Sequence, residues 1–237
     1  MKLAIMQPYF FPYLGYISLI KNTDRFILFD PVQFIRHGWI ERNRVLKPGW
    51  ETWQYIKIPL KKHAKDALIK DIIIDTQQNW KEKLLSQLVH YKKKAPYYKQ
   101  VLDVIIEGLS LPNDSIVDIN KSTLTAICNY LGIDRKIEIF SEMDINIDLP
   151  QAPDEWALNI CKSIGDVDEY WNPIGGMEFF SREKYKNAGI DLKFHNVKLN
   201  PYIQRIGRFE SGLSILDVMM FNSPDEINNM LDNYELK

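Results

Sequence analysis

Short apolar runs and amphipathic segments alternate along most of this chain. Strand-like patterning occupies residues 2–6, 24–30, 52–60, 71–75, 136–140, 169–172 and 192–197. Helical spacing of apolar side chains occupies residues 13–22, 153–164, 179–188 and 214–234. Strands that alternate with helices are typical of an α/β fold with a doubly wound, mainly parallel sheet. The pattern therefore predicts such a sheet, in a Rossmann-like arrangement.

Residues 79–132 depart from this alternation and read as helix throughout. Trp80 and Leu84 recur at helical spacing, a further helix is expected over 122–131, and Gly132 provides its C-terminal stop. The sequence predicts an α/β core formed by residues 1–78 and 133–237, with residues 79–132 as a helical insertion or lid.

The loop after the first strand, with the sequence QPYFFPY, is expected at the ligand-binding edge of the sheet. In parallel α/β sheets, ligands bind beyond the carboxyl ends of the strands, near the point where strand order reverses. Prolines fix the backbone of this loop. Gln7 offers a hydrogen-bond donor and an acceptor, and Tyr9 and Tyr13 offer flat faces with polar tips. We expect these three residues to contact a ligand; simple aromatic packing on the sheet is the alternative.

The loop after the second strand, DPVQFIRHGWIERNRV, is rich in groups that recognise anions. The guanidinium forks of Arg36, Arg42 and Arg44 match phosphate, and Trp39 supplies a plane for stacking. A nucleotide or a nucleotide-linked sugar suits this set best. An ordinary surface loop with ion pairs is the alternative.

The same loop contains the candidates for catalysis. Asp30, alone or with His37, could accept a proton as a general base. Asn43 and Gln33 could donate hydrogen bonds to a developing oxyanion.

Two later segments add candidate contacts. In YWNPIGG, Asn172 ends a strand, and Gly175 and Gly176 permit close approach of an anion to the backbone, although a plain turn fits equally well. The segment YIQRIGRFESGLSILD brings further polar residues near the last predicted strand: Gln204, Arg205, Arg208, Ser214 and Asp217. We interpret Ser214 as a helix N-cap, with Asp217 completing a start of the capping-box type.

Composition narrows the function classes. A formal net charge of −1 argues against broad attraction to nucleic acid or acidic membranes. The four histidines are scattered without ligand spacing, so no protein-built metal site is expected. Cys128 and Cys161 lie in apolar, helix-like sequence and read as buried thiols in a reducing compartment. The start of the chain does not read as a signal peptide, and no apolar run approaches the roughly 18 residues of a membrane span. We expect a cytoplasmic protein.

The segments MQPYFFPYLGY, DPVQFIRHGWIERNRV, KKAPYY, YWNPIGG and LSILD, in this order, resemble the WbqC-like protein family along essentially the whole chain. Members are typically encoded among genes for O-antigen and other surface polysaccharides. The resemblance implies work on nucleotide-linked sugars, often amino sugars. Motif by motif, it points to Gln7, Pro8, Tyr9, Pro12, Gly15, Asp30, Gln33, Trp39, Arg42, Asn43, Pro96, Tyr97, Asn172, Gly175, Gly176, Gln204, Ser214 and Asp217.

The leading hypothesis is a transferase that places an acyl or aminoacyl group on the amine of a nucleotide-activated sugar. Two alternatives stay open. The start of the chain is similar to that of HIGH-type nucleotidyltransferases, but Tyr16 stands where those enzymes carry a histidine. The second alternative is a non-catalytic protein that binds a nucleotide-sugar or assists assembly. The sequence does not identify a cofactor. The exposed aromatics of the first loop could equally cover a partner subunit in a homodimer.

Overall fold

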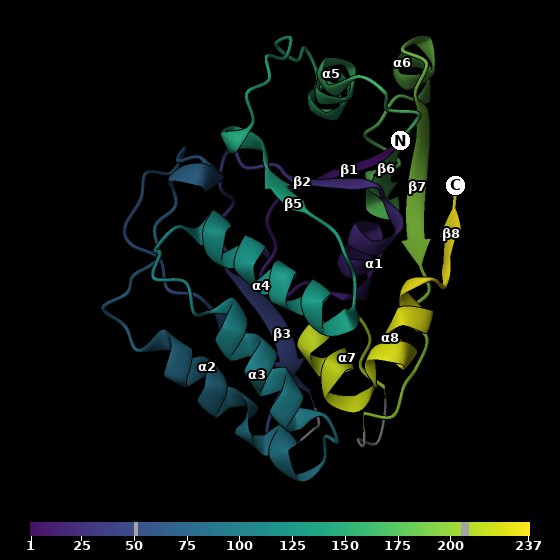
Figure 1. The fold of residues 1–237 in the computed structure, drawn as a ribbon. Helices are drawn as coiled ribbons and strands as arrows, with labels where there is room; N and C mark the ends of the chain where they lie inside the picture. Colours follow the sequence, from purple (N-terminus) through teal and green to yellow (C-terminus); the bar gives the residue numbers. More distant parts are fainter. Residues whose placement is uncertain (50–51, 205–208) are drawn as a thin grey trace.

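The computed structural model describes residues 1–49, 52–204 and 209–237, and its central feature is a six-stranded sheet in the order β5-β2-β1-β6-β7-β8 (Figure 1). The strands are β1 (Lys2–Met6), β2 (Arg25–Leu28), β5 (Ile137–Ile139), β6 (Glu169–Pro173), β7 (Asp191–Val197) and β8 (Tyr234–Leu236). All pairs are parallel except β7 with β8 at one edge. The predicted α/β fold with a mainly parallel sheet is confirmed.

Strand β1 is central, and strand order reverses beside it. Ile5 pairs with Ile27 of β2, whereas Ala4 pairs with Trp171 of β6. Leu3, Ala4 and Ile5 are all buried, as expected for a strand covered on both faces. Because the chain leaves β1 and β6 toward opposite sides, their carboxyl ends border a crevice.

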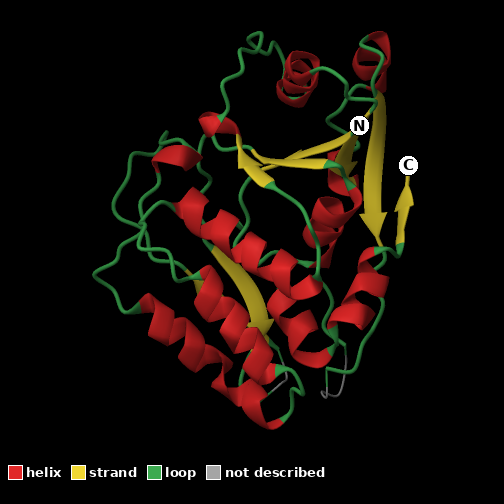
Figure 2. Ribbon diagram, in the orientation of Figure 1, coloured by secondary structure: helices red, strands yellow, loops and turns green. Residues whose placement is uncertain are grey.

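Helices cover both faces of the sheet (Figure 2). One face packs against α1 (Leu14–Asn22) and α4 (Ile116–Leu131), and the other against α5 (Glu155–Ile164) and α6 (Arg182–Asn187). Successive strand side chains point to opposite faces, so Phe26 belongs to the first core and Ile27 to the second. The C-terminal helices α7 (Ile215–Phe221) and α8 (Pro224–Leu231) extend the first core.

A long segment between β2 and β5 adds a second, smaller sheet and further helices. It contains β3 (Arg42–Leu46), β4 (Trp53–Lys57), α2 (Trp80–Leu88) and α3 (Tyr98–Gly108), followed by α4. β3 and β4 pair only with each other, in antiparallel register. The buried side chains of α2, α3 and α4 join the same core as α1.

Several local predictions are wrong. Residues 71–75 do not form a strand: a 3-10 turn over Ile69–Asp71 is followed by isolated bridges. The strand predicted over 52–60 pairs with β3, which lies in a stretch read as loop. The helix expected at 122–131 begins at Ile116, because Ser115 caps it by accepting a hydrogen bond from the Asp118 amide. Strand β8 was not predicted, because its three largely exposed residues are too few to show a strand pattern.

Both cysteines are buried, as expected, and burial raises the pKa of the Cys128 and Cys161 thiols to about 12. Such thiols stay protonated at neutral pH and are poor nucleophiles. Across the described ranges, none of the helices combines the length and apolar character needed to traverse a membrane.

The loop after β1 is held by hydrogen bonds that converge on one carbonyl group. Phe11 is buried and adopts a left-handed backbone with φ of 40°. Its carbonyl oxygen accepts hydrogen bonds from Asn43 Nδ2 of β3 and from Ser214 Oγ, each at 2.6 Å. Asn43 also donates to the Phe10 carbonyl at 3.3 Å. These bonds offset the about 1–2 kcal/mol that a left-handed backbone costs a residue with a Cβ.

A second buried network centres on Asp217 of α7. Its carboxylate accepts hydrogen bonds from the Tyr91 hydroxyl at 2.6 Å, from Gln204 Nε2 at 2.9 Å and from the Tyr202 hydroxyl. Burial raises the pKa of the Asp217 carboxyl to about 6, against the opposing effect of these bonds. Ser214 is the N-cap of α7, as predicted, but Asp217 serves this network and does not complete a capping box.

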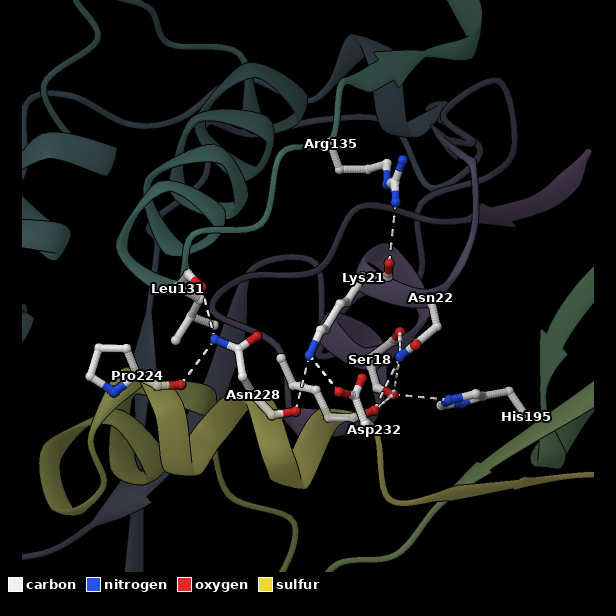
Figure 3. A network of polar contacts seen from close by, with 10 residues as sticks. Ser18, Lys21, Asn22, Leu131, Arg135, His195, Pro224, Asn228 and Asp232 are labelled. Carbon is white, nitrogen blue, oxygen red and sulfur yellow. Dashed lines mark hydrogen bonds and ion pairs between the residues drawn. The ribbon is translucent and has the colours of Figure 1, made fainter.

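A third network, drawn in Figure 3, ties α1 to β7 and α8. Ser18 Oγ donates to the Leu231 carbonyl at 2.5 Å and lies 2.9 Å from His195 Nε2. With its proton used in that way, the hydroxyl accepts from the imidazole. His195 packs beside Tyr234, with ring centroids 4.6 Å apart, and burial lowers the pKa of its imidazole to about 4.

Removing the Asn43 carboxamide should destabilise the fold. Asn43→Ala leaves the Phe11 carbonyl with one fewer donor and opens space in the core, so we expect a loss of about 2–3 kcal/mol in the free energy of unfolding. Asn43→Asp should also destabilise, because a carboxylate cannot donate to either carbonyl. Urea denaturation measures both, with the exposed Asn229→Ala as the matched control. An Asn43→Ala variant as stable as the control would contradict the role of this clamp.

His195 should make the protein sensitive to acid. Its pKa is about 4 in the folded state and about 6.5 in the unfolded chain, so between these values the unfolded state binds more protons. The free energy of unfolding therefore falls as pH drops from 6.5 toward 4. We expect His195→Gln, compared with wild type by thermal denaturation across this range, to show a shallower decline. The exposed His37→Gln should retain the wild-type slope.

Asp217 should make the protein more stable as the pH falls, which is the opposite of the effect of His195. Its folded pKa, about 6, lies above the unfolded value of about 3.9, so the folded state binds the extra proton in that window. Its contribution to stability is present at low pH and is lost as pH rises through 6. Relative to Asp217→Asn, wild type should thus gain stability on acidification from pH 7 to 4.5. The exposed Asp103→Asn is the control, and parallel pH profiles for wild type and Asp217→Asn would refute this assignment.

Candidate functional site

A cavity of about 730 Å³ opens where the sheet order reverses. Its wall comes from the carboxyl end of β1 and the loop that follows, from the loop after β2, from the start of α5 and from β6. Figure 1 shows α5 above β1 and β2 in the view, and Trp156, Ala157 and Ile160 of this helix line the cavity. Both loops singled out in the sequence thus contribute to one hollow, of a size typical of small-molecule sites.

The first loop contributes Gln7 and Tyr9 to the cavity wall, together with Tyr16 from α1. The Tyr16 hydroxyl donates to the Gln7 carbonyl at 2.8 Å, and the Tyr16 and Tyr9 rings meet edge to face at 5.5 Å. Tyr13 is not part of the wall. Its ring packs over Gly15, where an added Cβ would lie 2.5 Å from the ring, so a larger residue there would push the Tyr13 ring aside.

Trp39 is the large aromatic residue that the second loop contributes to the cavity wall. Its ring stacks on Tyr9 with centroids 5.8 Å apart. The Arg44 guanidinium lies 5.5 Å from the Trp39 ring and 5.2 Å from the Trp53 ring, and it donates to the Gly212 carbonyl at 3.1 Å. Arg44 therefore supports the tryptophan and is not itself among the residues of the wall.

The other two arginines also lie outside the cavity wall. Arg42 places its guanidinium 4.1 Å from the Tyr55 ring and donates to the His37 carbonyl. Arg36 is exposed and donates to the His63 carbonyl at 3.2 Å. The structure therefore does not bring the three arginines together around one phosphate position.

The three residues considered for catalysis are separated from the cavity and from one another. Asp30 is buried, and its two carboxylate oxygens accept from the Ser141 amide at 3.0 Å and the Ser141 hydroxyl at 2.5 Å. His37 sits on an exposed turn with φ of 60°, beside Glu41. Asn43 is committed to the carbonyls of the first loop. None of them is on the cavity wall.

The remaining candidates divide between the cavity and other places. Asn172 lines the cavity, and a Cβ added at Gly176 would lie 1.9 Å from Asn172 Nδ2, so a larger residue there would displace the Asn172 carboxamide. Gly175 has open space around it. Gln33 is exposed and donates to the Lys65 carbonyl. Gln204 belongs to the network of Asp217. Arg205 and Arg208 lie outside the described residues.

The sequence analysis missed the contribution of α5. Trp156, Ala157 and Ile160 line the cavity, as do Tyr170 of β6 and Phe180. The order of strands and helices along the sequence could have predicted the position of α5. A segment that connects two parallel strands must return from the carboxyl edge of the sheet, so the first turn of α5 has to lie at that edge.

The cavity is aromatic and uncharged. No Asp, Glu, Lys, Arg or His is found among the described residues that line it. Burial raises the pKa of the Tyr9, Tyr16 and Tyr170 hydroxyls, so they remain protonated and act as hydrogen-bonding groups. Within the described ranges, no group of three or more His, Cys, Asp and Glu side chains is arranged to hold a metal ion. The site can enclose an apolar or planar group and orient it through a few polar tips.

Comparisons with known proteins agree with the resemblance drawn from the motifs. No solved structure matches this chain significantly. The uncharacterized protein Rv1507c of Mycobacterium tuberculosis is 25% identical over 223 residues, which cover 93% of each of the two chains. The model of the WbqC-like protein family matches residues 7–229, nearly the entire sequence. The chain therefore belongs to the WbqC-like protein family.

Proposed function

We propose that this protein modifies a nucleotide-activated sugar during surface polysaccharide assembly, most directly by transferring an acyl or aminoacyl group to a sugar amine. The observation that carries the proposal is the aromatic cavity at the point where strand order reverses. Counted along the main sheet alone, the strands follow the order 3-2-1-4-5-6, which supports a Rossmann-like arrangement, although the last strand is antiparallel. Membership of the WbqC-like family supplies the polysaccharide context.

The cavity suits two reactants that meet at its mouth. Tyr9 and Trp39 present stacked aromatic faces of the kind that pack against sugars and planar groups. Gln7 and the Tyr9 hydroxyl can donate hydrogen bonds to the oxygen of a bound carbonyl group. Asp30 and Asn43 have no part in this proposal, because their polar atoms already bond within the protein.

The reaction needs an activated donor, for which we propose an acyl or aminoacyl thioester. The lone pair of the sugar amine attacks the carbonyl carbon, a C–N bond forms and the C–S bond breaks. The thiolate leaves with the electron pair of that bond, and the proton released by the amine nitrogen neutralises it. The protein contributes orientation of the two reactants and donors for the carbonyl oxygen as it becomes negative.

The geometry of the site disfavours one of the two alternative functions and agrees with the other. A HIGH-type nucleotidyltransferase is not favoured, because Tyr16 is buried with its hydroxyl on the Gln7 carbonyl and supplies no positive charge. A non-catalytic protein that binds a nucleotide-sugar has one observation in its favour. The described cavity wall contains no side chain that could act as a base near neutral pH.

A nucleotide-sugar should stabilise the protein, with its sugar ring packed against the aromatic faces of Tyr9 and Trp39. We expect uridine or thymidine diphosphate amino sugars to raise the melting temperature, and Tyr9→Leu to weaken binding about tenfold by removing a stacking face. Thermal shift and calorimetry measure both, with Tyr130→Leu, half-buried on α4 and outside the cavity wall, as the control.

Mass spectrometry of the same mixtures with acetyl and glycyl thioesters then separates the candidates. A product heavier by the transferred group supports the transferase. Binding without any product supports the non-catalytic alternative. If none of these nucleotide-sugars binds, the proposed function is wrong.

A further inference from the structure

Most of the buried residues that line the cavity are apolar. Its floor is made by Ile5, Phe29 and Ile160, with Ala157 and Phe180 beside them. A phosphate or other ion placed there would lose its hydration without meeting an opposite charge, which costs several kcal/mol or more. The wall therefore selects against the charged part of a nucleotide-sugar.

The polar groups deep in the wall already have partners within the protein. Tyr16 donates to the Gln7 carbonyl at 2.8 Å, and Asn172 Nδ2 lies 3.2 Å from the Pro173 carbonyl. The Tyr170 hydroxyl lies 3.4 Å from Asn172 Oδ1. A nucleobase needs several directed donors and acceptors along its edge, and these groups already use part of that capacity within the protein.

The polar groups that remain open are carried by less buried residues. The side chains of Gln7, Tyr9 and Trp156 line the cavity yet form no hydrogen bond with any described residue. Gln7 is exposed, and Tyr9 and Trp156 are half-buried, which marks the outer part of the cavity. The site thus combines an apolar interior with a small set of hydrogen-bonding groups nearer solvent.

We infer that the cavity is an acyl-binding site: it encloses the hydrocarbon part of the acyl donor, with the donor's carbonyl group at the level of Gln7 and Tyr9. This inference deepens the proposed function and rests on it for the identity of the acceptor. The diphosphate of the nucleotide-sugar lies outside the cavity, in solvent. The sugar amine then approaches the donor's carbonyl carbon from the mouth.

The test is a chain-length series on wild-type protein. S-acyl-N-acetylcysteamine thioesters carrying acetyl, butanoyl, hexanoyl and octanoyl groups are titrated calorimetrically at low and high salt concentration. Each methylene removed from water should tighten binding about fourfold until the cavity is full. Salt should have little effect, because no ion pair is involved.

A variant that fills the floor gives the matched experiment. Ala157→Leu should abolish the gain from butanoyl to octanoyl while acetyl binding persists, and the same substitution at the exposed Ala64 should change nothing. Circular dichroism checks the fold of both variants, and the wild-type series decides the question even if Ala157→Leu does not fold.

The outcomes separate this inference from the proposed function. Affinity that is independent of chain length, or an octanoyl probe that binds Ala157→Leu as tightly as wild type, overturns the acyl site. A diphosphate sugar that competes with the octanoyl probe, and that also loses affinity in Ala157→Leu, shows that the cavity holds the nucleotide instead. A full chain-length effect without any nucleotide-sugar binding keeps the acyl site and overturns the proposed acceptor.

Discussion

The carbonyl group of Phe11 is the point on which the architecture of the site depends. Two side chains distant in sequence, Asn43 and Ser214, donate to it at 2.6 Å and hold the loop after β1 in a left-handed turn. Without these donors an L-residue would relax to negative φ, because its Cβ crowds the backbone in the left-handed region. That relaxation would redirect the loop and with it Tyr9, which forms one wall of the cavity.

The remaining polar networks hold the parts of the fold that surround this loop. Asp217 joins α7 to Tyr91 and Tyr202, and Ser18 joins α1 to His195 and α8. Both networks contain a buried ionisable group whose pKa is shifted in the direction that favours its neutral form, because burial penalises the charged form. The interior therefore gains connections between distant segments at the expense of some sensitivity to pH.

The cavity owes its character to the layers of the fold. It lies outside the sheet at the reversal of strand order, so its floor is built from the same apolar residues as the core beneath α5. Its arginine neighbour, Arg44, contributes by packing between Trp39 and Trp53 and not by facing a ligand. An aromatic wall supported by a guanidinium is stiff, and stiffness favours orientation of a bound group over adaptation to many ligands.

The sequence by itself determined the alternation of strands and helices, the mainly parallel sheet and the two loops at its carboxyl edge, because hydrophobic periodicity and turn residues are local signals. It did not determine what the polar side chains of those loops do. Asp30 and Asn43 look free for chemistry in the sequence, yet each forms hydrogen bonds with a residue far along the chain. The contribution of Trp156 could be inferred only from the topology that places the first turn of α5 at the carboxyl edge of the sheet. Only tertiary structure decides which hydrogen bonds are satisfied internally and which atoms still face a cavity, because that outcome depends on contacts between segments that the local pattern does not encode.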